Sequence, residues 1–186
     1  MWQTLQCSNS TRVVQQCIGL LIAWPALLFA TELVPQVRRP VALALVDSES
    51  HLLVANHHSG TLSAVDLGSR TVVGETRVGR SLSAFIVGQK RAIGVALDDT
   101  ESCLVTGEIR GHGFYPQGKT TVGRAPVHVL LSADERRAFV ASLWARQTTI
   151  VDVTTSCKPR VLATIDLPFS PLLQILLPDP RYLVVA

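Results

Sequence analysis

The sequence predicts an all-β fold built from repeated antiparallel units, and three observations support this. Valine, leucine and alanine supply much of the 47% hydrophobic content, threonine is also frequent, and aromatic residues contribute only 5%, a balance that favours many short strands over long helices. Apolar residues alternate within short runs such as 61–67, where Leu62 and Ala64 face one way and Ser63 and Val65 the other. The third observation is that such runs recur at a fixed interval along the chain.

The recurring landmarks are proline and aspartate residues spaced by multiples of about 43 positions. Pro40 and Pro126 are 86 positions apart, as are Asp66 and Asp152, and half of this interval is 43. A period in the low forties matches one four-stranded blade of a β-propeller, which takes about 40 to 45 residues. We therefore expect three blades and the start of a fourth, over residues 38–80, 81–124, 125–168 and 169–186. The chain offers too few blades to close a ring, for which about four are the minimum.

Within the first unit, four strands follow one another in 38–50, 51–60, 61–70 and 71–80, separated by turn residues such as Ser59-Gly60 and Gly68-Ser69. The second unit is less regular. Its stretch 93–107 resembles the first two strands of the first unit, whereas 108–119 does not resemble a third strand. We expect an irregular second blade, either divergent or carrying a functional loop.

The repeat carries a resemblance to a known family. A proline is followed by leucine and aspartate, then by LLVANHHSGTLSAVDL and VVGETRVG, and the second strand recurs as LVAN, FVAS and LVVA. Over residues 38–186 this resembles the YVTN family of β-propeller repeats. The resemblance implies a seven-bladed extracytoplasmic disc, as in surface-layer or binding proteins, with relatives among lactonase-like enzymes and quinoprotein-like subunits. The haem motif of propellers attached to c-type cytochromes is absent from this sequence.

The N-terminal sequence is typical of an export signal. Arg12 is the only charged residue before Glu32, and the uncharged run 17–30 that follows it is shorter than the roughly 20 residues that span a bilayer. Residues 1–30 are therefore predicted to be a signal peptide cleaved after Ala30, with an uncleaved anchor as the alternative. Either arrangement places the repeat outside the cytoplasm, in the periplasm or at the cell surface.

Cysteine usage predicts no metal site and no cofactor. Cys103 and Cys157 are the cysteines that follow the predicted signal, and no CxxC, CxxCH or mixed histidine–cysteine spacing occurs. The sequence leaves open whether these two pair in a disulfide, but Cys103 precedes Leu104 and Val105 as a buried strand residue would.

Strand direction predicts where a binding site lies. Because successive antiparallel strands alternate in direction, the loops between second and third strands share one rim with the blade-to-blade loops. We expect ligand-binding or partner-binding residues on that rim, and His128 just inside it, where it could point into the channel. The candidates are His57, His58, Arg80, His112, Arg124, His128, Trp144 and Arg146. Each of them has an alternative interpretation as a solvated or structural loop residue.

These features favour an extracytoplasmic binding or scaffolding module over an enzyme. The sequence has no GxSxG elbow, HExxH helix or phosphate-binding glycine loop, and its net charge of +3 without a basic cluster argues against nucleic acid. The expected partners are a protein or a small anionic ligand at the rim, and a second copy through the open blade edge. A fragment of a lactonase-like hydrolase or quinoprotein-like oxidoreductase subunit is the alternative, and a truncated, nonfunctional remnant is a third interpretation.

Overall fold

The computed structural model describes residues 38–179 and 182–186, so the predicted signal segment 1–30 lies outside the described residues. All of the described residues belong to one compact unit. The regular structure of this described part is entirely β-strand, in agreement with the predicted all-β class. It contains no helix with the length and hydropathy needed to cross a membrane.

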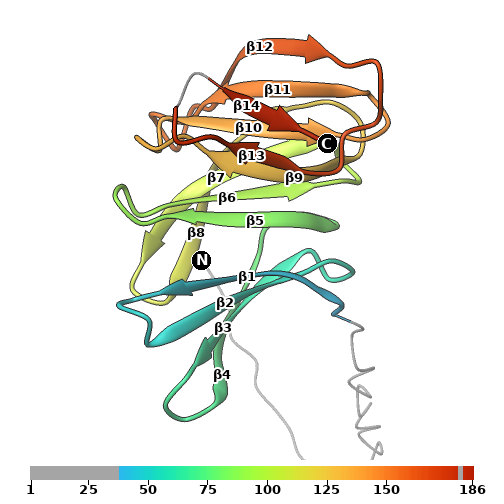
Figure 1. Cartoon of the computed structure of the whole chain (residues 1–186). Coiled ribbons are helices and arrows are strands. Elements are labelled where there is room, and N and C mark those ends of the chain that lie inside the picture. Colours follow the sequence, from blue (N-terminus) through green and yellow to red (C-terminus); the bar gives the residue numbers. More distant parts are fainter. Residues whose placement is uncertain (1–37, 180–181) are drawn as a thin grey trace, which may run out of the picture. The chain divides into compact units, whose positions relative to one another are not determined.

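The strands form four antiparallel sheets in which chain order equals spatial order (Figure 1). The first sheet holds β1 (Pro40–Val46), β2 (His51–Asn56), β3 (Thr61–Asp66) and β4 (Thr71–Arg77). The second holds β5 (Leu82–Gly88), β6 (Ile93–Asp98), β7 (Cys103–Arg110) and β8 (Gly113–Thr121). The third holds β9 (Pro126–Leu131), β10 (Arg137–Ser142), β11 (Gln147–Asp152) and β12 (Arg160–Asp166). The fourth has two strands, β13 (Gln174–Leu176) and β14 (Leu183–Val185).

The prediction of an irregular second blade was wrong. Residues 93–98 and 103–110 are its second and third strands rather than its first and second, and 82–88 supplies the first. Every residue of β6 is buried, so this strand lacks the alternation that marked its counterparts. Gly94 and Gly107 leave room for the buried ring of Phe114, because an added Cβ at either would lie within 2.7 Å of that ring. The second blade therefore has glycine at these two positions because the ring of Phe114, from β8, occupies the space that their own side chains would fill.

The sheets stack through two apolar layers. The first strands β1, β5, β9 and β13 lie beside one another in succession. One core cluster joins the first and second sheets and includes Leu53, Leu62 and Phe114, and Phe85 meets Phe114 edge to face with centroids 5.7 Å apart. A second cluster joins the second and third sheets. These layers stabilise the stack of sheets, since each large apolar side chain that is buried contributes about 1.5 to 3 kcal/mol.

Polar contacts also join the second and third sheets. The buried carboxylate of Glu135 accepts hydrogen bonds from the backbone amides of Lys90 at 3.0 Å and Arg91 at 2.8 Å. The Arg91 guanidinium in turn donates to the carbonyl oxygens of Glu135 and Thr154. Gly88 permits this approach, because a Cβ there would lie 2.6 Å from a Glu135 oxygen. Together, the apolar layers and these polar contacts hold the described sheets as an open, incomplete part of a ring of blades.

Candidate ligand-binding site at the rim

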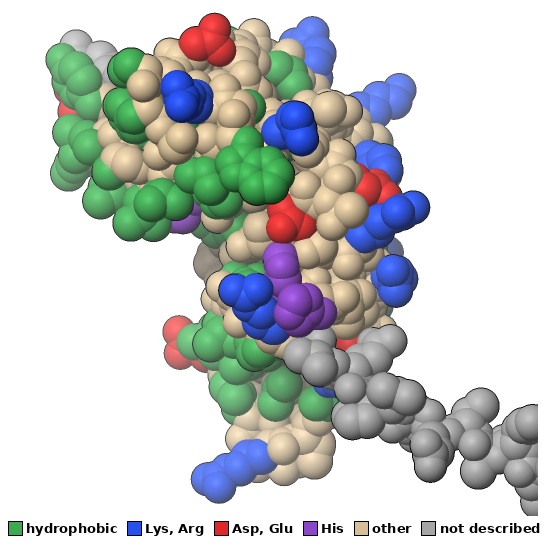
Figure 2. Space-filling model, turned by 90° about the vertical axis from the view of Figure 1, so that its right-hand side faces the viewer, with side chains coloured by type: hydrophobic (Ala, Val, Ile, Leu, Met, Phe, Trp, Pro, Cys, Tyr) green, Lys and Arg blue, Asp and Glu red, His purple; other side chains and the backbone are tan. Residues whose placement is uncertain are grey.

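One end of the sheets gathers the turns between second and third strands together with the linkers between blades. Backbone hydrogen bonds join these segments. The amide of Leu82 donates to the carbonyl oxygen of His57 at 3.2 Å, and the amide of Asp99 to the carbonyl oxygen of Ser81 at 3.0 Å. The amide of Leu143 donates to the carbonyl oxygen of Ala125 at 2.8 Å. Figure 2 views this end, where histidine and cationic side chains lie near the middle of the face. Loops from three successive blades are therefore held together as one rim.

A cavity of about 640 Å³ opens at this rim. Its polar lining combines one guanidinium, one carboxylate, one imidazole and three hydroxyls, and its apolar lining includes an indole. The lining residues are His57, Ser81, Asp99, Thr100, Ser102, Arg124, Ala125, Val127, Leu143 and Trp144. Ligand sites in proteins commonly have this form, a concave surface with a few convergent polar groups.

His57 is positioned by the linker that follows the first blade. Its Nδ1 lies 2.9 Å from the carbonyl oxygen of Leu82, a contact that requires Nδ1 to carry the proton and leaves Nε2 as an acceptor. The Ser81 hydroxyl lies 3.1 Å from Nδ1 and 3.4 Å from Nε2. An oxygen nearly equidistant from both nitrogens is not aligned with the Nε2 lone pair, so the two side chains do not form an activated serine–histidine pair.

Arg124 and Trp144 approach the cavity from the third blade. The amide of Ala145 donates to the carbonyl of Arg124 at 3.3 Å, which ties the linker to the β10–β11 turn. Both side chains are exposed, and 72% of Trp144 is accessible to solvent. Among the described residues, no ion pair involves the Arg124 guanidinium. This cation and the flat indole are consequently available to a ligand.

The second blade contributes through a buried carboxylate beneath the rim. Asp98 is fully buried, and its two oxygens accept hydrogen bonds from the amides of Arg80 at 2.6 Å, Thr100 at 3.0 Å and Glu101 at 3.1 Å. It therefore ties the 78–81 linker to the β6–β7 turn. Gly79 leaves room for it, since any Cβ at that position would overlap the carboxylate. Two walls of the cavity depend on this one side chain.

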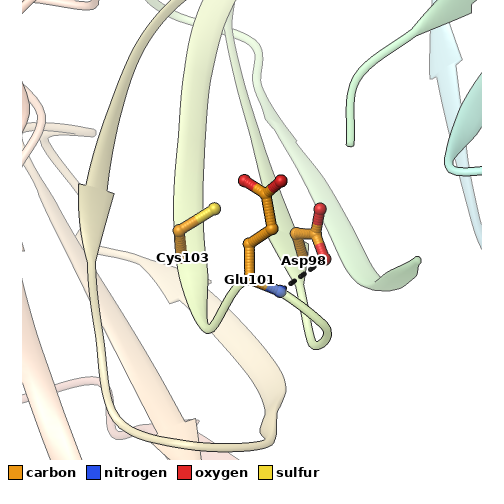
Figure 3. Close-up of side chains that lie close together, drawn as sticks. All are labelled: Asp98, Glu101 and Cys103. Carbon is orange, nitrogen blue, oxygen red and sulfur yellow. Dashed lines mark hydrogen bonds between the residues drawn. The ribbon is translucent and has the colours of Figure 1, made fainter. Parts of the chain in front are cut away.

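Asp98, Glu101 and Cys103 offer three potential metal ligands within 4.8 Å of one another (Figure 3). Their own contacts explain the cluster without an ion. The amides occupy Asp98, while Glu101 pairs with Lys119 at 2.8 Å and with Arg80 at 3.2 Å; Lys119 and Arg80 together lower the pKa of Glu101. Burial and the Asp98 charge raise the pKa of the Cys103 thiol to about 11, so it stays protonated at neutral pH and is a poor ligand.

The structure brings together some of the predicted site residues and separates others. His57, Arg124 and Trp144 line the cavity; exposed His58 packs edge-on against His57 with centroids 5.0 Å apart. Arg80 and Arg146 lie on the same rim but point into solvent, the first bound to Glu101.

His112 and His128 lie elsewhere. The expectation of His112 at this rim was wrong, because it sits in the β7–β8 turn at the opposite end of the sheets and stacks on His51 with centroids 5.0 Å apart. His128 lies on the innermost strand β9 with its Nδ1 buried and without a hydrogen-bond partner among the described residues. Burial lowers the pKa of His128, which favours the neutral form of its imidazole.

Sequence reasoning missed Ser81, Asp99, Thr100 and Ser102. The last three lie in the β6–β7 turn, and the incorrect strand assignment of the second blade hid that turn. The signal was present, because 99–102 stands between two apolar runs as 57–60 does in the first blade. The disulfide left open from the sequence does not form: Cys103 and Cys157 are both free, one buried and one exposed.

Comparisons with known proteins bear on the fold. No family model matches the chain, and no curated protein matches it. Solved structures do match: a putative 6-phosphogluconolactonase from Bacteroides fragilis superposes with a TM-score of 0.70 at 13% identity, covering 83% of this chain and 49% of that one. The periplasmic gluconolactonase of Pseudomonas aeruginosa gives 0.65 at 14% identity, covering 79% and 42%. A β-propeller domain from Myceliophteria thermophila gives 0.60 at 12%, covering 72% and 45%.

The chain has a β-propeller fold. Its four-stranded antiparallel blades and these neighbours agree on this architecture. At such low identity the likeness extends to the fold alone. This open propeller spans less than half the length of each of the three structures compared.

Proposed function

We propose that this propeller is an extracytoplasmic binding module that holds a small hydroxylated acid in its rim cavity. The observation that carries the proposal is the convergence of complementary groups from three successive blades on one cavity of about 640 Å³. The uncharged apolar run 17–30, which follows Arg12, supports the extracytoplasmic location of the chain. One structural neighbour is also named as a periplasmic protein.

Each group in the cavity suits one part of such a ligand. The Arg124 guanidinium can bind a carboxylate or phosphate through two parallel hydrogen bonds. Asp99 and the hydroxyls of Ser81, Thr100 and Ser102 can bind ligand hydroxyls. The Asp99 carboxylate would repel a ligand made of an anion alone, so the lining favours an acid that also carries hydroxyls. The indole of Trp144 provides a flat apolar surface for the carbon skeleton.

Calorimetric titration with D-gluconate and 6-phosphogluconate tests this proposal. Sorbitol, which has hydroxyls but no charge, and acetate, which has charge but no hydroxyls, are the matched controls. We expect binding of at least one sugar acid, no measurable binding of the controls, and at least tenfold weaker binding by Arg124→Met. Arg146→Met removes a cation of the same rim outside the cavity and should bind as the wild type does. Absence of binding by both acids, or equal losses in the two variants, would refute the proposal.

Lactone hydrolysis is the second candidate function. Two structural neighbours carry gluconolactonase in their names, and the acceptor Nε2 of His57 lies at the same cavity as Asp99. A histidine acceptor could take a proton from an attacking water. Hydrolysis of glucono-δ-lactone above the spontaneous rate, abolished by His57→Gln, would favour this activity over binding alone.

A further inference from the structure

The first and fourth sheets each present an apolar face without a neighbour among the described residues. On the first sheet, Leu43 is 63% exposed and is flanked by the exposed side chains of Val41 and Leu45. On the fourth sheet, Ile175 is 63% exposed, beside Leu173 and Val184. Figure 2 shows hydrophobic side chains gathered at both of these levels. Contiguous exposed apolar faces of this kind mark interaction surfaces.

Strand register shows what the face on the first sheet would contact. Leu43 pairs with Val54 of the adjacent strand, and Phe85 and Val129 occupy the same step of the second and third sheets. Phe85 is 7% exposed and Val129 4%, because each packs in the layer shared with the preceding blade. Leu43 is exposed because no described blade precedes the first sheet. The face around Leu43 therefore has the form of a blade surface that receives a preceding blade.

The face on the fourth sheet is of the opposite type. Gln174 corresponds to Leu43, because it stands three positions after Pro171 as Leu43 stands three positions after Pro40. It is 3% exposed, and its side chain lies 3.2 Å from the hydroxyl of Thr148 in the third sheet. Alternation along β13 then directs Leu173 and Ile175 to the other side. In the second sheet, Ile86 lies on that side and packs against the layer shared with the following blade. The fourth sheet thus offers the surface that a following blade would cover.

We propose that a second copy of this chain covers both faces, head to tail, so that two chains close one ring. The fourth sheet of each chain would pack on the first sheet of the other, in the way that successive blades pack within the chain. Length supports this occupant: the chain spans 49%, 42% and 45% of three propeller structures, so two copies supply nearly the length of one. A heterologous interface closes into a ring when its rotation allows.

Packing of the two Leu43 faces on each other is the less favourable geometry. Both internal layers of the chain join a face of the Ile175 type to a face of the Leu43 type, and neither joins two faces of the same type. Head-to-tail pairing repeats a contact that this sequence already makes. The two sides of each interface can also be mutated independently, because Leu43 lies on one side of each interface and Ile175 on the other.

Light scattering coupled to size exclusion, on the full chain with its N-terminal processing determined by mass spectrometry, tests the proposal. We expect a mass of two chains for the wild type. Leu43→Lys or Ile175→Glu alone places an unpaired charge in both interfaces and should weaken the dimer at least tenfold. An equimolar mixture of the two variants should restore the dimer, since one interface is then wild type and the other pairs lysine with glutamate. Leu162→Lys, on the exposed strand β12, is the matched control and should leave the mass unchanged.

Circular dichroism confirms that each variant remains folded before its mass is interpreted. A monomeric wild type would overturn the proposal and leave both faces to other blades. Open-ended oligomers would overturn ring closure. Failure of the mixed variants to restore the dimer would overturn head-to-tail pairing, because an interface between identical faces gives no such complementation.

Discussion

Removal of the Asp98 carboxylate should loosen the rim and destabilise the whole blade. Its three hydrogen bonds are accepted from amides of Arg80, Thr100 and Glu101, and a hydrogen bond to a charged group contributes about 1.5 to 3 kcal/mol. Arg80, Thr100 and Glu101 are all exposed residues, so in Asp98→Ala their amides can turn partly to water. We therefore expect a loss of about 3 kcal/mol rather than the full sum of three bonds.

Asp98→Asn refines this expectation. An amide keeps one acceptor oxygen but presents an NH₂ group where the second oxygen stood, so we expect a loss of roughly 2 kcal/mol, smaller than for alanine. The free energy of unfolding is measured by urea titration followed by circular dichroism. Hydrogen exchange should accelerate at Arg80 and Glu101 in both variants. An unchanged urea midpoint, or unchanged exchange at these amides, would refute the role assigned to Asp98.

Three further outcomes follow from the packing. Phe114→Ala should lower the free energy of unfolding in urea by about 3 to 5 kcal/mol, because the ring fills a space bordered by Gly94 and Gly107. Phe114→Leu should lower it by less, and equal losses in the two variants would contradict this packing. Gly60→Ala should destabilise strongly, since φ is +64° and the added Cβ would overlap backbone of the next linker; an unchanged melting temperature would be inconsistent with this turn. The pKa of Cys103 is raised to about 11 in the folded state, against 9.0 when unfolded. The resulting stabilisation is complete below pH 9, and about 2 to 3 kcal/mol of it is lost as the pH rises toward 11. Thermal melting of Cys103→Ala should show a smaller decline over this pH range, and an identical decline in the variant would contradict the assignment.

The blade repeat could be predicted from the sequence because it rests on local signals. Alternating residues such as those of 61–67 and turn residues such as Ser59-Gly60 report strand and turn geometry directly. The rim could likewise be predicted, since strand alternation alone places the loop of His57 and the linker of Arg124 at the same end of the sheets. The second blade was harder because β6 is buried throughout and carries no alternation.

The remaining features depend on contacts between distant segments. Asp98 accepts from the nearby amides of Thr100 and Glu101 as a turn residue does, but nothing local marks its third contact, with the amide of Arg80 18 positions away. The stacking of His112 on His51 joins two different blades, and the burial of His128 follows from the blades around it. Side chains at such positions acquire their roles from tertiary packing, which a repeat pattern does not encode.

A binding site formed by loops of three successive blades should respond to ligand as one unit. Hydrogen exchange of the wild-type chain with and without 6-phosphogluconate tests it most directly. We predict slower exchange together in 57–60, 99–102, 124–127 and 143–146, the rim segments that border the cavity, with no change in the outer strands β4, β8 and β12. Protection confined to the opposite end of the sheets, or no protection at saturating ligand, would contradict the account.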